Sequence, residues 1–174
     1  MDPNCQLRAN FVEIPKKPNI NQYDHCNYGT MWLWEINKGD DYHSEGNRLK
    51  MSMGIPLNDE DRFPWLQSLR SELVQHKNAI LACSALKKSY RNVLSSSNDA
   101  NNQTKTLFVL LSANKSLLEK RVSERKGHFA HPSLIESQLE TLESFGEDEK
   151  YLVIDASDSL MNITQKIINS LSTG

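Results

Sequence analysis

The chain has 174 residues, of which 38% are hydrophobic and 24% charged, a balance typical of one globular domain. Its net charge of −2 at pH 7 excludes the global positive field that attracts nucleic acid or an anionic membrane surface, so any anionic ligand has to be bound by locally placed basic residues. We therefore expect no nucleic-acid partner and no membrane partner.

The three cysteines, Cys5, Cys26 and Cys83, are widely separated in the sequence. They form no CxxC pair and have no metal-ligand spacing with the five histidines, so we expect no metal site. The first residues lack an apolar run of signal-peptide length, and nowhere do about 18 apolar residues follow one another. These features predict a reduced, cytoplasmic protein.

Residues 1–38 differ in character from the rest of the chain. They contain three prolines and many asparagines, and short apolar runs such as 11–14 are cut off by proline. Their best strand candidate is 30–36, TMWLWEI, which is rich in aromatic residues. We expect 1–38 to be a divergent, largely irregular leader and 39–174 to be the folded domain.

From residue 59 onward, helical and strand patterns alternate along the chain. Short apolar runs are typical of buried parallel strands, and apolar residues at helical spacing lie between them. This alternation predicts an α/β fold with a parallel sheet. The predicted strands are 79–83, 106–111 and 151–154, and the predicted helices are 59–77, 85–94, 115–125 and 160–171.

Reactive side chains follow two of the predicted strands. Asp40 comes after the strand at 30–36, and Lys87 and Lys88 come after the strand at 79–83. Because ligands bind at the carboxyl ends of parallel strands, these residues are expected at one edge of the sheet. A carboxylate there can accept a hydroxyl proton, and the lysines can neutralise an anion. The alternative is that Asp40 belongs to an ordinary loop or helix cap.

Arg62 lies in the charge run NDEDR at the start of a predicted helix. A guanidinium can bind a carboxylate through two hydrogen bonds, so Arg62 is a candidate for binding an acid. The alternative is an exposed arginine that forms a surface ion pair with Asp59 or Asp61, which is the commoner fate of such a charge run.

Arg121 and Arg125 lie four residues apart on one predicted helical face, just before Lys126 and a glycine. Such a spacing suits a lid that closes on a polyphosphate. The alternative is a solvated helix end, where basic residues favour the helix dipole.

Taken together, several sequence blocks resemble the gluconokinase family, small P-loop kinases related to the shikimate kinases. Each block alone is a weak signal, but their joint occurrence in a consistent order is specific. The resemblance runs from about residue 39 to the C-terminus. The blocks are DxxH-x3-N-x2-KM at 40–51, G-x-PLND-x-DR-x-PWL at 54–66, CSALKK-x-YR at 83–91, RKGHF at 125–129 and QLETLE at 138–143.

The resemblance implies a P-loop kinase-like, three-layer parallel sheet and ATP-dependent phosphorylation of D-gluconate to 6-phosphogluconate. It implies gluconate as the small-molecule partner and ATP with Mg²⁺ as cofactors, and it leaves a homodimer open. The implied site residues are Asp40 as the carboxylate that meets the acceptor hydroxyl, Arg62, Lys87, Lys88 and His43 as substrate-binding residues, and Arg121, Arg125 and Lys126 as the nucleotide lid.

The sequence departs from the family pattern in its phosphate loop. None of the seven glycines is followed by lysine, so GxxxxGK[ST] does not occur, and Lys38 stands where the family usually has an aspartate. We therefore expect a fold that is incomplete at the N-terminus, with unpaired edges beside the first strand's position, and a chain that is weak or inactive as a kinase. The alternative is a non-catalytic form that binds a sugar acid or associates with a full-length copy.

Overall fold

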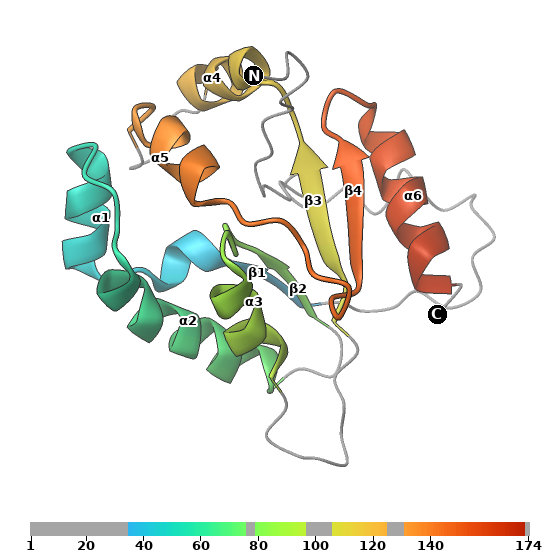
Figure 1. Ribbon diagram of the computed structural model, residues 1–174, viewed down its shortest axis with the longest axis horizontal. Coiled ribbons are helices and arrows are strands. Elements are labelled where there is room, and N and C mark those ends of the chain that lie inside the picture. Colours follow the sequence, from blue (N-terminus) through green and yellow to red (C-terminus); the bar gives the residue numbers. More distant parts are fainter. Residues whose placement is uncertain (1–34, 76–78, 97–105, 125–130, 173–174) are drawn as a thin grey trace.

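The computed structural model describes residues 35–75, 79–96, 106–124 and 131–172 (Figure 1). Helices and parallel strands alternate along the chain, which confirms the predicted α/β class. In chain order the elements are β1 (Glu35–Lys38), the 3₁₀ helix η2 (Gly39–Tyr42), α1 (Glu45–Ser52), α2 (Asp59–Leu73), β2 (Ala79–Ala82), α3 (Lys88–Ser95), β3 (Phe108–Ser112), α4 (Lys115–Glu124), α5 (Leu134–Thr141), β4 (Tyr151–Asp155) and α6 (Leu160–Ser172).

The described strands form two parallel pairs. β1 pairs with β2, with Glu35 opposite Ala79, and β3 pairs with β4, with Phe108 opposite Tyr151. Within the described residues no ladder joins β2 to β3, so each pair is a two-stranded sheet. Two-stranded sheets depend on packing against helices for their stability. Among the described residues, β2 and β3 therefore each have one edge with no strand partner.

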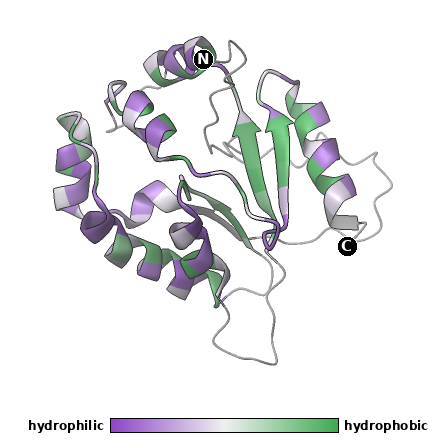
Figure 2. Cartoon of the chain, in the orientation of Figure 1, coloured by the Kyte–Doolittle hydropathy of each residue, from purple (hydrophilic) through white to green (hydrophobic). Residues whose placement is uncertain are grey.

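One hydrophobic core lies around β3 and β4. Leu111 and Ile154 from these strands pack with Leu118 of α4, and Ile163 of α6 lies against the cluster. Apolar colouring runs along both strands in Figure 2, and α6 lies beside β4. The four-residue spacing of Ile163 and Ile167 explains why α6 forms, because it places both side chains on the face toward the strands.

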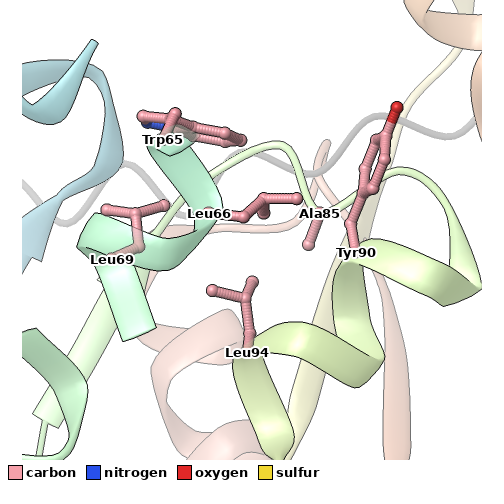
Figure 3. Close-up of a cluster of buried hydrophobic side chains, with 6 residues drawn as sticks. All are labelled: Trp65, Leu66, Leu69, Ala85, Tyr90 and Leu94. Atoms are coloured by element: carbon pink, nitrogen blue, oxygen red, sulfur yellow. The ribbon is translucent and has the colours of Figure 1, made fainter. Parts of the chain in front are cut away.

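A second core lies between α2, α3 and β2 (Figure 3). Trp65, Leu66 and Leu69 of α2 are almost fully buried, and they pack with Tyr90 and Leu94 of α3. The apolar residues on α2 recur at three- and four-residue spacing, as in an amphipathic helix. This core fixes the start of α2 beside the loop that follows β2.

The helix boundaries differ from the predicted ones for identifiable reasons. α2 is capped by Asn58, whose side chain accepts a hydrogen bond from the Asp61 N–H in a reciprocal capping box, and not by Asp59 or Asp61. It ends at Leu73, four residues earlier than predicted. α3 begins at Lys88, not at residue 85, because residues 83–86 have no regular secondary structure and the side chains of Ala85 and Leu86 are buried.

Two helices were not predicted, α1 and α5. α1 carries a glycine and few apolar residues, but Ser44 caps it by accepting from the Asn47 N–H. The predicted strand at 30–36 overlaps only the start of β1, since residues 30–34 lie outside the described residues. No helix in the described ranges is long and apolar enough to span a membrane.

Candidate acceptor site

Asp40 lies in η2, directly beyond the carboxyl end of β1. The preceding residue has to be glycine, because a Cβ on Gly39 would lie 2.7 Å from Cβ of Cys83 and 2.9 Å from the backbone oxygen of Ala82. The indole Nε1 of Trp65 donates to the Gly39 oxygen over 2.7 Å. The end of β1 is therefore fixed against both β2 and α2, which places Asp40 at the sheet edge where the sequence predicted it.

His43 follows Asp40 by three residues and is buried. Its ring stacks on the Trp65 indole, with 4.4 Å between ring centroids and an interplanar angle of 10°. Burial lowers the pKa of His43 to about 4, and the charges of Arg62 and Arg48 act in the same direction while Asp40 opposes them. The imidazole is therefore neutral at pH 7, so it can both donate and accept a hydrogen bond.

Arg62 lies in α2 and is only 7% exposed. Its Nε donates to the Leu57 oxygen over 3.2 Å, its Nη1 lies 3.5 Å from the Ser84 hydroxyl oxygen, and its guanidinium carbon lies 5.8 Å from the Tyr90 ring centroid. Burial lowers the pKa of Arg62 from its usual value. The guanidinium remains charged at pH 7 because an arginine pKa starts so high.

The alternative of a surface ion pair for Arg62 is wrong. Asp59 pairs with Lys87 and Asp61 pairs with Lys50, and among the described residues no carboxylate forms an ion pair with Arg62. A buried charge without an ion-pair partner is costly, and an anionic ligand would compensate it. The structure thus presents a buried cation suited to a carboxylate.

Lys87, Asp59 and Tyr90 form a connected group beside Arg62. The Lys87 ammonium donates to both carboxylate oxygens of Asp59, over 2.7 and 2.9 Å, and the Tyr90 hydroxyl donates to the same carboxylate. Figure 3 shows the Tyr90 hydroxyl directed away from the hydrophobic cluster that holds its ring. The hydrogen bonds from Lys87 and Tyr90 lower the pKa of Asp59, so it is ionised at pH 7.

A hollow of about 500 Å³ lies over this group. Its lining combines polar and apolar surface and comes from the start of α2, the start of α3 and the end of α5. The lining residues are Leu57, Asn58, Asp59, Glu60, Lys87, Tyr90 and Thr141. A hollow with this lining suits a small ligand rich in hydroxyl groups.

Lys88 points away from this hollow. Its ammonium pairs with Asp148 over 2.7 Å, and its backbone N–H donates to the Glu143 carboxylate. The structure therefore brings Asp40, His43, Arg62 and Lys87 to one region and directs Lys88 toward the segment before β4. Lys87 and Lys88 are neighbours at the start of α3, but their side chains face different sides, and the sequence pattern alone did not distinguish them.

Of the predicted lid residues, the structure describes Arg121 alone. Arg121 belongs to α4, and its guanidinium donates to the Ala156 oxygen, just beyond the end of β4, over 2.6 Å. Arg125 and Lys126 lie outside the described residues. Arg121 is thus placed beside the carboxyl end of the β3–β4 pair.

The phosphate-loop motif is absent from the sequence, and the part of the chain that the structure describes contains no cluster of metal-binding side chains. The 174 residues contain no GxxxxGK[ST] loop, whose backbone N–H groups and lysine bind phosphates in P-loop proteins. Among the described residues, no group of three His, Cys, Asp or Glu side chains could hold a metal ion. The site geometry therefore concerns the acceptor alone.

Sequence reasoning missed two parts of the site. Trp65 was noted only as part of the motif at 54–66, but it fixes Gly39 and stacks on His43. Asp59 was considered only as an ion-pair partner of Arg62, but it binds Lys87 and Tyr90. The available signal was the presence of both Asp59 and Tyr90 in the motif blocks of the acceptor region.

Comparison with known proteins gives consistent relatives over most of the chain. A probable gluconokinase of Dictyostelium discoideum is 40% identical over 148 residues, which cover 78% of this chain and 72% of the relative. A probable gluconokinase of Mus musculus is 37% identical over 154 residues, covering 79% and 84% of the two chains. The thermoresistant gluconokinase of Escherichia coli is 36% identical over 141 residues, covering 78% of each.

Solved structures agree with these relatives. An unliganded sugar kinase from Janibacter sp. superposes with a TM-score of 0.70 at 35% identity, covering 80% of each chain. A gluconokinase from Sinorhizobium meliloti superposes with a TM-score of 0.66 at 34% identity, covering 80% of this chain and 78% of that one. No protein-family model matches the sequence. On these identities and coverages, the chain belongs to the gluconokinase family of kinases with a P-loop kinase fold.

Proposed function

We propose that the site of this chain binds D-gluconate, the acceptor that family members phosphorylate with ATP to give 6-phosphogluconate. The observation that carries this proposal is the buried Arg62 guanidinium, which has no ion-pair partner among the described residues and lies beside a polar hollow. A sugar acid offers both a carboxylate for such a cation and hydroxyls for the polar lining.

The proposed roles follow from position. Arg62 binds the carboxylate of the acid, and Asp40 accepts the proton of the hydroxyl that is phosphorylated. His43, neutral at pH 7, hydrogen-bonds a hydroxyl, and Lys87 contributes through its contacts with Asp59. Lys88 is proposed to act indirectly, through the segment before β4 that its ion pair with Asp148 holds. Arg121, Arg125 and Lys126 are proposed to bind the nucleotide.

We also propose that a polypeptide of these 174 residues transfers phosphate weakly or not at all. The supporting observation is the absence of GxxxxGK[ST] from the sequence. Losing three charge-assisted hydrogen bonds to phosphate, at about 1.5–3 kcal/mol each, removes on the order of 5 kcal/mol or more. At about 1.4 kcal/mol per tenfold, this corresponds to a factor of roughly a thousand or worse in ATP binding or rate.

Two measurements test these proposals separately. Calorimetric titration with gluconate should show binding to the wild-type chain and its loss in Arg62→Gln, while circular dichroism shows that the variant is folded. A coupled ATP–gluconate assay should show little turnover. Absence of gluconate binding would refute the acceptor site, and turnover at ordinary kinase rates would refute the predicted weakness.

A second candidate is a non-catalytic form that associates with another chain. The observation that favours it is the division into two sheets, since the edges of β2 and β3 have no strand partner among the described residues. Unpaired edges are templates for strands from other molecules. Light scattering of the chain, alone and mixed with a family gluconokinase that has the phosphate loop, tests this candidate. A monomer in both experiments would exclude it.

A further inference from the structure

The Asp59 carboxylate has an acceptor position left over. An ionised carboxylate has about four lone-pair positions and no donor. Two are used by the Lys87 ammonium and one by the Tyr90 hydroxyl. The Asp59 side chain is 65% exposed and lines the hollow, so the remaining position is accessible to a ligand there.

Asp59 is also held in a fixed orientation. Lys87 donates to both of its oxygens, and the Lys87 ammonium lies 5.5 Å from the Tyr90 ring centroid. The Tyr90 ring is buried in the second core and therefore cannot move freely. An acceptor fixed in this way costs little ordering entropy when it binds a hydroxyl.

The same contacts decide where a ligand carboxylate can go. The charge of Lys87 is compensated by Asp59, and the negative charge of Asp59 repels a second carboxylate. Arg62 forms no ion pair with a described carboxylate and lies within cation–π distance of the Tyr90 ring. An acid with hydroxyls therefore has one favoured orientation, with its carboxylate at Arg62 and its hydroxyls at Asp59.

We propose that Asp59 is a specificity-determining residue of the acceptor site, which accepts a hydrogen bond from a hydroxyl of an open-chain sugar acid and so selects hydroxylated acids over plain carboxylic acids. This inference rests on the proposed binding of a sugar acid. It assigns the polyol part of the ligand to Asp59, Lys87 and Tyr90, and it assigns the carboxylate to Arg62. Lys87 then acts as the positioning residue of Asp59, not as the partner of the ligand carboxylate.

The test compares two acids of equal chain length by calorimetry, gluconate and hexanoate, which lacks the hydroxyls. The test variant is Asp59→Asn, and the matched control is Asp148→Asn. The control breaks the ion pair of Asp148 with Lys88, which lies next to Lys87 in the chain but outside the hollow. We expect Asp59→Asn to bind gluconate roughly tenfold more weakly, the size of one lost charge-assisted hydrogen bond. Hexanoate should bind equally well or more tightly, because the Lys87 charge is released. Asp148→Asn should keep the wild-type preference.

A second variant guards against a folding artefact. Tyr90→Phe keeps the buried ring and removes only one hydrogen-bond donor to Asp59. It should therefore lower the preference for gluconate over hexanoate, but by less than Asp59→Asn does. The inference would be overturned if Asp59→Asn kept the wild-type preference for gluconate over hexanoate, or if Asp148→Asn lost that preference equally. Gluconate binding through Arg62 would still stand in either case. A wild-type chain that binds no gluconate would overturn both the inference and the proposed function.

Discussion

The guanidinium of Arg91 and the carboxylate of Glu149 form a two-pronged ion pair, with 2.6 Å between Nε and Oε1 and 3.1 Å between Nη2 and Oε2. The two side chains are 0% and 5% exposed. Arg91 lies in α3, after the first pair of strands, and Glu149 lies just before β4 of the second pair. The ion pair therefore connects the two sheets, which share no ladder among the described residues. Arg91 also donates to four backbone oxygens, those of Ala85, Leu86, Glu143 and Ser144.

Replacing Arg91 with alanine should strongly destabilise the protein. The change leaves the Glu149 carboxylate buried without its partner, and breaking a buried pair in this way costs about 3–5 kcal/mol. Urea unfolding of the two proteins measures the difference. The matched control is Lys115→Ala, which breaks an exposed pair with Glu136 and should cost about 1 kcal/mol or less. Equal effects of the two changes would contradict the structural role of Arg91.

The contribution of Glu149 should depend on pH in a defined direction. The hydrogen bonds from Arg91 lower the pKa of Glu149 below its usual 4.5. A carboxylate whose folded pKa is lowered stabilises the fold fully above the unfolded pKa and loses that contribution as the pH falls through the folded pKa. The difference in free energy of unfolding between the wild type and Glu149→Gln should thus be constant from pH 7 to about 4.5 and become smaller below that pH. A difference that persists undiminished at pH 3 would contradict this account.

Two glycine substitutions should have opposite effects. Gly39→Ala places a methyl group 2.7 Å from Cβ of Cys83 and 2.9 Å from the Ala82 oxygen, so it should cost about 1–3 kcal/mol by overpacking. Gly46→Ala in α1 meets only the Ser44 hydroxyl oxygen at 4.0 Å and should stabilise the helix by up to about 1 kcal/mol. Thermal unfolding of both variants measures the signs. A neutral Gly39→Ala would show that β1 and β2 are not closely packed at their carboxyl ends.

The sequence could predict the fold class and the general position of the acceptor residues. Apolar runs such as 79–82 identify strands without any tertiary information, and the residues after parallel strands converge by topology. Asp40 and Lys87 were placed correctly at this edge for that reason. The prediction of open strand edges followed from the resemblance, and it concerns a part of the sheet that residues outside the described ranges could complete.

The pairing of charges could not be predicted from the sequence. Arg62 has Asp59 and Asp61 as its nearest acidic neighbours in the chain, yet these pair with Lys87 and Lys50 instead. Which carboxylate meets which cation depends on helix packing and on the direction of each side chain. The Arg91–Glu149 pair, 58 residues apart, has no local signal in the sequence for the same reason.

The final prediction concerns His43, whose buried ring has its pKa lowered from 6.5 to about 4. Between these pH values the unfolded chain binds a proton that the folded chain does not, so the free energy of unfolding should rise as the pH rises from about 4 to 6.5. A shift of this size corresponds to at most about 3.4 kcal/mol. His43→Phe keeps an aromatic ring against Trp65 and removes the titration, so its stability should depend less on pH in this range.

An NMR titration measures the same quantity directly. The imidazole resonance that disappears in His43→Phe should titrate with a midpoint near pH 4 in the wild-type chain, because desolvation is the largest cause of the lowered pKa. A midpoint near 6.5 would show that the His43 ring is solvated and not stacked on Trp65. At pH 7 the imidazole is mostly neutral with either midpoint, so this titration tests the burial of His43 and not its ability to accept a hydrogen bond in the acceptor site.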